Sequence, residues 1–152
     1  AARYLGSLPY VDADRIGIWG WSYGGYNVLM SMSRGNGAIK AGVAIAPVTD
    51  WRFYDTVYTE RFMRTPQQNI VGYDKGSPIA LAGNLKGNLL IIHGTADDNV
   101  HIQNSMEYAR ALINEGKHFD MFFFPDKNHS IVGASAREYL YEKVINYFKE
   151  NL

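Results

Sequence analysis

A serine flanked by glycines, at a spacing typical of hydrolytic nucleophiles, lies near the start of the chain. Ser22 stands between Gly20 and Gly24 in the sequence GWSYGG, directly after the apolar run RIGIW. This Gly-x-Ser-x-Gly pattern forms a nucleophile elbow when a strand turns sharply into a helix and leaves the serine exposed at the sheet edge. The two glycines are expected because larger side chains would collide in that turn. The strand-like run before the motif and the apolar helical run 26–32 after it favour an elbow over an ordinary loop.

An elbow serine works with a carboxylic acid and a histidine base, which follow it along the chain in that order. Asp97 lies in the loop HGTADDNV, which begins at the end of the strand-like run 88–93. His129 lies in the loop PDKNHS, directly after the strand-like run 119–124. Catalytic groups of open α/β sheets gather at the carboxyl ends of the strands. We therefore predict that Ser22, Asp97 and His129 converge at one sheet edge as nucleophile, acid and base.

The choice of acid leaves one alternative open. Asp98 is adjacent to Asp97 and could take its role, while the non-catalytic alternative makes one of the pair the N-cap of the following helix. We favour Asp97 as the acid.

Three further histidines compete with His129 as the base. One ends a buried strand, where we expect it to be packed and hydrogen-bonded, and the others precede a helix and a strand (His93, His101 and His118). None lies in a loop that follows a strand, so His129 is preferred. His93 and His101 are also close in sequence to the two aspartates, but the chain contains no His-x-His or His-Glu-x-x-His spacing, and we predict no metal site.

The composition is that of a globular domain without a dominant charge. Apolar residues make up 47% of the 152 residues, enough to bury a sizeable core. Lysine plus arginine and aspartate plus glutamate both total 15, which argues against a nucleic-acid or anionic-membrane partner. No apolar stretch approaches the roughly 20 residues that cross a bilayer. The absence of cysteine excludes disulfides, thiolate metal sites and a cysteine nucleophile, and no cofactor is predicted.

Strand-like and helical segments alternate, which predicts an α/β architecture. The strand-like runs are mostly continuous in apolar residues, as in a parallel sheet covered on both faces. The expected strands are 15–19, 41–46, 88–93 and 119–124. The expected helices are 23–34, 51–63, 101–115 and 135–152, the last with Ser135 as its N-cap. Residues 64–86 are rich in proline and glycine and are expected to form a loop over the active site.

A row of aromatic residues lies within the expected helix 51–63. On a helix, Trp51, Tyr54 and Tyr58 occupy positions i, i+3 and i+7 and share one face. Such a face can form a flat apolar slot for a ligand, although an aromatic row of this kind is more often ordinary core. The neighbouring catalytic loops favour the slot.

Five motifs in order along the chain resemble the prolyl oligopeptidase family of serine peptidases. They are GWSYGGY at 20–26, APV at 46–48, WxxYDxVYTER at 51–61, HGTADDNVH at 93–101 and the late His129. The similarity covers essentially all 152 residues, and the strings YTER and TADDNV favour the dipeptidyl peptidase branch. The resemblance implies the C-terminal half of an α/β-hydrolase domain, with about four mostly parallel strands flanked by helices.

The roles known in that family fall on matching positions of this chain. Ser22, Asp97 and His129 resemble the nucleophile, acid and base. The backbone N–H of Tyr23 resembles half of the oxyanion hole, and Asn99 resembles the side chain that binds a backbone carbonyl of the substrate. The walls of the proline-accepting pocket are matched by Val48, Trp51, Tyr54, Tyr58 and Val100.

The resemblance also implies an activity, the release of N-terminal dipeptides from peptides with Pro or Ala at the second position. The alternatives are another serine hydrolase of the same fold, such as an acylaminoacyl peptidase or an esterase, and a non-catalytic interaction module. A homodimer formed through residues 119–152 is implied as well. The location implied is extracytoplasmic, whether periplasmic, secreted or membrane-anchored.

Parts of the family's machinery are expected outside this sequence. The opening residues AARYL favour a helix but include no initiator Met, and we expect them to end a helix that begins earlier in a longer polypeptide. In the family, acidic residues of an N-terminal β-propeller hold the substrate's amino terminus, and a tyrosine from the first half of the hydrolase domain completes the oxyanion hole. Residues 1–152 are thus expected to form a partial hydrolase domain, nearly inactive alone, with one exposed sheet edge.

Overall fold

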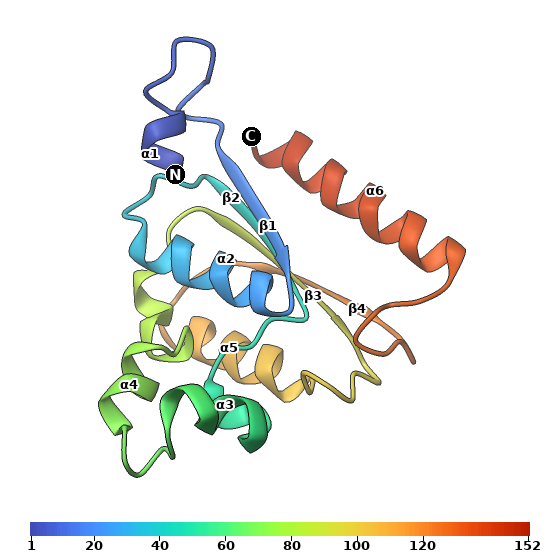
Figure 1. Cartoon of the computed structure of the whole chain (residues 1–152). Coiled ribbons are helices and arrows are strands. Elements are labelled where there is room, and N and C mark those ends of the chain that lie inside the picture. The colour runs from blue at the N-terminus through green and yellow to red at the C-terminus, as the bar shows by residue number, and fades with distance from the viewer.

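The computed structural model describes all 152 residues and contains one four-stranded parallel sheet. The strands lie across the sheet in chain order: β1 (Gly17–Trp21), β2 (Ala41–Ile45), β3 (Asn88–Gly94) and β4 (Asp120–Phe124). Helices separate the strands along the chain (Figure 1). The predicted α/β architecture is confirmed.

Helices cover both faces of the sheet. On one face lie α2 (Tyr23–Arg34), α5 (Gln103–Asn114) and the short 3-10 helix η2 (Ile79–Asn84). On the other lies α6 (Ala134–Asn151), which Figure 1 shows standing apart from the rest of the helices. Side chains of β3 alternate between the two layers: Leu89 and Ile91 enter the α2/α5 core, and Leu90 and Ile92 enter the α6 core. Because helices bury both faces of the sheet, side chains on both sides of each central strand are apolar, which accounts for the continuous apolar runs in the sequence.

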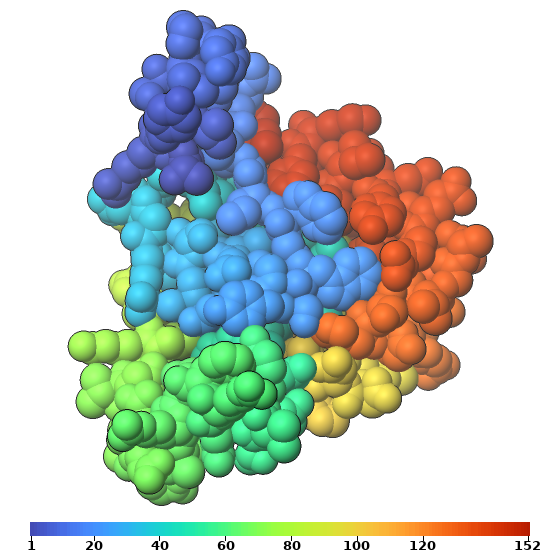
Figure 2. Space-filling view, viewed as in Figure 1, coloured from blue at the N-terminus to red at the C-terminus, as the bar shows by residue number.

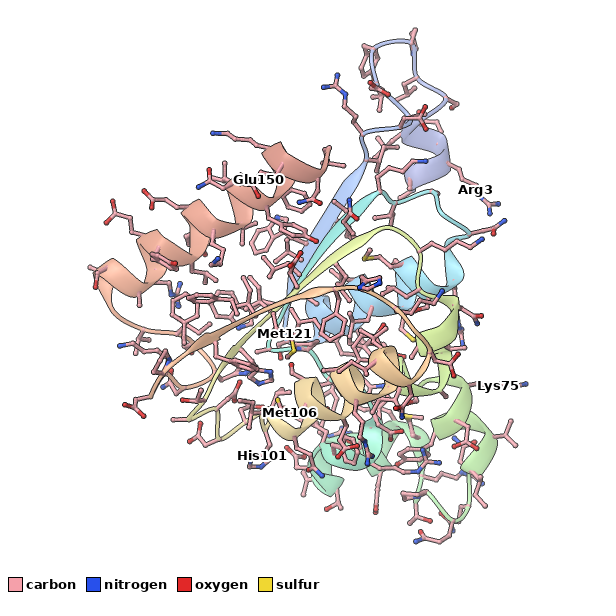
Figure 3. The ribbon with its side chains drawn as sticks, turned by 180° about the vertical axis from the view of Figure 1, so that it is seen from behind. Arg3, Lys75, His101, Met106, Met121 and Glu150 are labelled. Carbon is pink, nitrogen blue, oxygen red and sulfur yellow. The ribbon has the colours of Figure 1, made fainter.

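The two edge strands differ from the buried centre. Every residue of β2 is buried, whereas Trp19 of β1 is half exposed and meets Tyr141 of α6 edge to face. Next to the open edge of β1, the N-terminal segment with α1 (Ala2–Leu5) projects from the body of the molecule (Figure 2). From behind, β4 runs over α5, and its Met121 packs against the α2/α5 core (Figure 3).

The predicted helix 51–63 is wrong as a single element. A 3-10 turn, η1 (Trp51–Phe53), is followed by an extended Tyr54, and the α-helix α3 (Thr56–Met63) starts afresh. Two aspartates cause the break, since each accepts a backbone N–H at the start of its own helix: Asp50 from Arg52 and Asp55 from Tyr58. The aromatic residues therefore do not share one helical face.

Other boundaries moved for local reasons. Ser135 is not an N-cap, because α6 begins at Ala134 and Gly133 occupies the N-cap position. Gly133 has a φ of 120°, a value that glycine adopts far more readily than other residues. Residues 64–86 are not a plain loop, since they contain η2 and α4 (Ile70–Lys75), which Asn69 caps with its side chain. β1 extends two residues beyond its expected end at Trp19, so the strand runs directly into Ser22.

Candidate active site

The turn from β1 into α2 holds Ser22 in a strained backbone conformation. Its φ is 59° and its ψ is −117°, a combination that non-glycine residues rarely adopt. The turn is fixed on both sides: the N–H of Ser22 donates to the carbonyl of Ile45 at 2.8 Å, and its carbonyl accepts the N–H of Tyr26 at 3.0 Å. This is the geometry of a nucleophile elbow, with the serine between the end of a strand and the first turn of a helix.

The glycines of the elbow differ in how closely other atoms approach them. A Cβ on Gly20 would lie 2.4 Å from the backbone of Gly24, so any side chain there would force the turn apart. A Cβ on Gly24 would meet nothing within 4 Å, and the expectation that both flanking glycines relieve collisions is wrong for this one. The second close approach is at Gly25, where a Cβ would lie 2.9 Å from the carbonyl oxygen of Ile45. Gly25 thus lets α2 pack against β2.

Alanine substitutions separate these glycines by their effect on stability. Gly20→Ala is expected to lower the free energy of unfolding by about 1–3 kcal/mol, the usual cost of overpacking. Gly24→Ala is the matched control and is expected to leave stability equal or to raise it by up to about 1 kcal/mol, because alanine favours a helix. Thermal unfolding of the two variants measures the difference. Equal destabilisation by both would contradict the assigned cause.

Asp97 and His129 meet at the carboxyl edge of the sheet. His129 Nδ1 lies 2.8 Å from Asp97 Oδ2. The other carboxylate oxygen accepts the backbone N–H groups of Asn99 and Val100, each at 3.0 Å. The Asp97 side chain is fully buried, whereas that of His129 is 20% exposed. The loop after β3 therefore presents a fixed carboxylate to an imidazole that solvent or a substrate can reach.

The contacts of Asp97 fix its charge and the tautomer of His129. Burial by itself raises the pKa of Asp97, but hydrogen bonds from His129, His93 and the Asn99 amide outweigh burial and hold that pKa well below its usual range. Because an ionised carboxylate only accepts hydrogen bonds, Nδ1 of His129 carries a proton. In the neutral ring, Nε2 is left as the acceptor, which is the state required of a general base.

The competing residues take neither the position of the buried acid nor that of the solvent-accessible histidine. Asp98 is exposed and does not cap the following helix, since α5 begins after Ile102 without a side-chain cap. His101 and His118 are exposed, and His93 is fully buried and hydrogen-bonded, as expected. Ser22 forms hydrogen bonds through its backbone, and its hydroxyl makes none, so the structure pairs His129 with Asp97 and not with Ser22.

Two residues that the sequence did not single out anchor the loop of His129. The indole N–H of Trp21, next to Ser22, donates to the carbonyl of His129 at 2.9 Å. From α6, Arg137 donates to the carbonyl of Ser130 through Nε at 3.1 Å and Nη2 at 2.9 Å, and its guanidinium lies 5.3 Å from the centre of the Trp21 ring. Trp21 occupies a variable position of the Gly-x-Ser-x-Gly pattern, and nothing in the sequence connects Arg137 to a loop seven residues before it.

Removal of the Arg137 side chain is expected to lower kcat about tenfold, because His129 then lies in a loop with one anchor fewer. Arg137→Lys should restore only part of the rate, since an ammonium group cannot both bind the carbonyl and stack as a plane on Trp21. Steady-state kinetics at saturating substrate measures this. Glu138→Ala, an exposed neighbour, is the control and should leave kcat unchanged; equal losses in both variants would refute the anchoring role.

Aromatic rings gather beside the elbow although the helix that was expected to align them is broken. Trp51 lies at the centre, with ring centroids 5.5 Å from Tyr23, 6.0 Å from Tyr54 and 6.0 Å from Tyr58. Val48, Trp51, Tyr73 and Val100 form the buried floor of this cluster. A cavity of about 390 Å³ adjoins the cluster, and Trp51 and Tyr58 are the two predicted pocket residues that line it. Its full lining is Tyr23, Tyr26, Trp51, Tyr58, Thr59, Phe62, Met63 and Gly76. Such a slot fits a small, flat, apolar group.

The side chain of Asn99 is oriented by its neighbour across the site. The Tyr54 hydroxyl donates to Asn99 Oδ1 at 2.8 Å. Because the amide oxygen is engaged, the amide N–H groups of Asn99 are left to donate to a ligand. Asn99 and Val100 also give their backbone N–H groups to Asp97, so one short loop connects the acid to the aromatic slot.

Comparison with known proteins agrees with this geometry. All residues from 1 to 152 match the prolyl oligopeptidase family. The chain belongs to this family. The crystal structure of Porphyromonas gingivalis dipeptidyl peptidase 4 superimposes with a TM-score of 0.97 at 58% sequence identity, and covers 99% of this chain. The predicted family resemblance and the α/β-hydrolase character of the fold are thereby confirmed.

Curated proteins similar to this chain include two that are named probable dipeptidyl-aminopeptidase B. The probable dipeptidyl-aminopeptidase B of Grosmannia clavigera is 51% identical, and that of Paracoccidioides brasiliensis 47%, each over 97% of this chain. The match spans 15% and 16% of those two relatives and 22% of the P. gingivalis chain. The chain thus corresponds to a small part of the family proteins that it resembles.

Two further observations bear on ligands and membranes. No three His, Asp or Glu side chains are grouped so that they could hold a metal ion. None of the helices combines the length and the apolar character needed to cross a bilayer.

Proposed function

We propose that the protein containing this chain is a serine dipeptidyl peptidase that releases N-terminal dipeptides from peptides with Pro or Ala at the second position. The observation that carries the proposal is the 2.8 Å pairing of Asp97 with His129 at the sheet edge where the Ser22 elbow also lies. The aromatic slot beside the elbow supports the preference for proline.

In the proposed mechanism, Ser22 Oγ attacks the carbonyl carbon after the second residue of the substrate, and its proton passes to Nε2 of His129. Asp97 holds the imidazole in the correct tautomer and stabilises the imidazolium. When the C–N bond breaks, the imidazolium gives its proton to the leaving amine. Water then attacks the acyl-enzyme with the same base, releases the dipeptide and returns the proton to Ser22.

Substrate binding is assigned to the residues around the slot. The pyrrolidine ring of the second residue occupies the pocket formed by Val48, Trp51, Tyr54, Tyr58 and Val100. Val48, Trp51, Val100 and Tyr54 belong to one apolar cluster, and the ring of Tyr58 packs against those of Trp51 and Tyr54. Asn99 donates from its amide to a substrate carbonyl. The backbone N–H of Tyr23 stabilises the oxyanion, aided by its place at the start of α2.

The remaining parts of the site are assigned to residues beyond 1–152 on the family resemblance: a second oxyanion donor and acidic groups for the substrate's amino terminus. The loss of one oxyanion donor typically lowers turnover about 10²–10³-fold. Residues 1–152 expressed alone are therefore expected to be nearly inactive on a Gly-Pro chromogenic substrate.

A substrate panel on the full-length protein tests the proposal. The panel contains Gly-Pro, Gly-Ala and Gly-Gly p-nitroanilides, N-acetyl-Gly-Pro p-nitroanilide, an N-acetylalanine p-nitroanilide and a short-chain ester. We expect hydrolysis of the Gly-Pro and Gly-Ala substrates and poor hydrolysis of the rest. Preference for the acetylated amino acid would identify an acylaminoacyl peptidase, and preference for the ester an esterase. Absence of any hydrolysis would favour a non-catalytic module.

Assembly is proposed to be homodimeric, through β4 and α6. Large apolar side chains of α6 are exposed, among them Tyr139, Tyr141 and Ile145. Light scattering of the full-length protein, compared with its Ile145→Asp variant, distinguishes a dimer through this helix from a monomer. An extracytoplasmic location is proposed on the family resemblance.

A further inference from the structure

His93 is a buried histidine that the proposed mechanism does not use. It lies near the end of β3, and its side chain is fully buried. Its Nδ1 lies 2.7 Å from Ser105 Oγ of α5. Its Nε2 lies 2.7 Å from the carbonyl oxygen of Val100 and 3.2 Å from Asp97 Oδ2. Both ring nitrogens are therefore engaged, and one of them reaches the carboxylate that pairs with His129.

The partners of His93 determine which nitrogen carries its proton. The Val100 carbonyl and the Asp97 carboxylate can only accept hydrogen bonds, so Nε2 must donate. Ser105 can donate or accept, and its hydroxyl supplies the proton that a neutral ring needs at Nδ1. A neutral ring satisfies every partner without the burial of a further charge. His93 is therefore a neutral Nε2–H donor; the two acceptors at Nε2 fix this tautomer, and Ser105 supplies the hydrogen bond to Nδ1.

Two hydrogen bonds and one close contact form a closed ring that joins the acid to the substrate slot. His93 donates to the Val100 carbonyl, and the Val100 N–H donates to Asp97 Oδ1. Asp97 Oδ2 completes the ring by its contact with His93 and also accepts from His129. We propose that His93 is a positioning residue for the reaction: its N–H fixes the rotation of the Asp97 carboxylate and takes up part of the charge that would otherwise act on His129. This role rests on the proposed function.

The surroundings of Asp97 support the role. Burial raises its pKa, and hydrogen bonds from His129 and then His93 are the largest of the effects that lower the pKa. Tyr54 is a third titratable side chain near Asp97; burial raises the pKa of Tyr54, and Asp55, Tyr58 and Asp97 raise that pKa further. The α5 residues nearest to this region, Asn104 and Ser105, are uncharged. The guanidinium of Arg137 is hydrogen-bonded to the carbonyl of Ser130, the residue after His129. Substitution of His93 leaves all of these groups in place.

Two substitutions of His93 separate the N–H donor from the rest of the ring. In His93→Asn the amide reaches the position of Nδ1 but is too short for Asp97, so the donor to the carboxylate is lost. In His93→Gln the longer amide reaches the position of Nε2, so a donor is kept. Ser105→Ala removes the partner of Nδ1 and keeps the Nε2–H donor. The three variants are made in the full-length protein, with circular dichroism as the test of folding.

The readout is the pH dependence of kcat/KM on a Gly-Pro substrate. Without the His93 donor, more of the carboxylate charge acts on His129 and stabilises the imidazolium, whose Nε2 cannot accept the proton of Ser22. We expect the acid limb of the His93→Asn profile to move up by about 0.5–1 pH unit, the effect of one hydrogen bond, with kcat about tenfold lower. His93→Gln and Ser105→Ala should keep the wild-type acid limb, with kcat within about threefold of wild type. A folded His93→Asn variant with an unmoved limb would overturn the role.

If His93→Asn does not fold, the other two variants decide. A displaced acid limb in both of them, or a loss of kcat in folded His93→Gln as large as that of Asp97→Asn, would overturn the proposal. Failure of the proposed function is recognised separately, because the wild-type protein would then not hydrolyse the Gly-Pro substrate, and the role of His93 would fall with it.

Discussion

His129→Gln in the full-length protein is expected to lower kcat on a Gly-Pro substrate by roughly 10⁵–10⁶-fold, the loss seen when the base of a serine triad is removed. Glutamine can still accept or donate one hydrogen bond at this position, but it cannot take the proton of Ser22 and return it to the leaving amine. KM should change little, because His129 lies at the β4–α6 loop and not among the rings of the slot.

Steady-state kinetics with purified variants measures this loss, and His118→Gln serves as the control. His118 is exposed and precedes β4, so its substitution should leave kcat within about twofold of wild type. A loss below about 100-fold in His129→Gln would mean that another group serves as the base.

Asp97→Asn is expected to lower kcat about 10⁴-fold with little change in KM. Asp97 Oδ1 accepts two backbone N–H groups, so the amide oxygen of asparagine must take that position. The amide N–H₂ is then forced to face His129, where it donates to Nδ1 and leaves the proton on Nε2. An imidazole in this tautomer points a proton at Ser22 and cannot act as its base.

Asp98→Asn is the matched control, because it makes the same chemical change at the adjacent, exposed carboxylate. Its kcat should stay within about threefold of wild type. Stopped assays at high enzyme concentration can follow the slow variant. A larger loss in Asp98→Asn than in Asp97→Asn would transfer the role of acid to Asp98.

The sequence is sufficient for the fold class, the family and the meeting of the Asp97 and His129 loops. The loops of Asp97 and His129 each follow a strand-like run, and parallel strands bring their carboxyl ends to one edge, so the sequence predicts that the two loops lie together. The structure places those two side chains in hydrogen-bonding contact. Their catalytic roles, like that of Ser22, stay predictions until the variants are measured.

The features that sequence did not predict depend on contacts between distant segments or on competing local bonds. The helical spacing of Trp51, Tyr54 and Tyr58 indicated one helix, but the side chains of Asp50 and Asp55 each start a separate helix. The spacing of apolar residues along the sequence does not indicate where a side chain caps a helix. The rings still meet around Trp51, because the core brings them together and not because they share a helical face.

Arg137 and His93 show a second limit. Arg137 acts on the His129 loop only because α6 folds back beside β1 and Trp21. His93 is packed and hydrogen-bonded as the sequence predicts, but its 3.2 Å contact with Asp97 depends on the loop geometry after β3. No motif in the sequence predicts either contact, because each forms only when the tertiary structure brings the two side chains together.

The most direct test of the central claim is the site of labelling by a fluorophosphonate, which reacts with a serine that a neighbouring base activates. The full-length protein is labelled, digested, and the modified peptide is identified by mass spectrometry. We predict one label on Ser22, lost in Ser22→Ala and strongly slowed in His129→Gln. A label on another serine, or undiminished labelling of the Ser22→Ala protein, would contradict the assignment of Ser22 as the nucleophile.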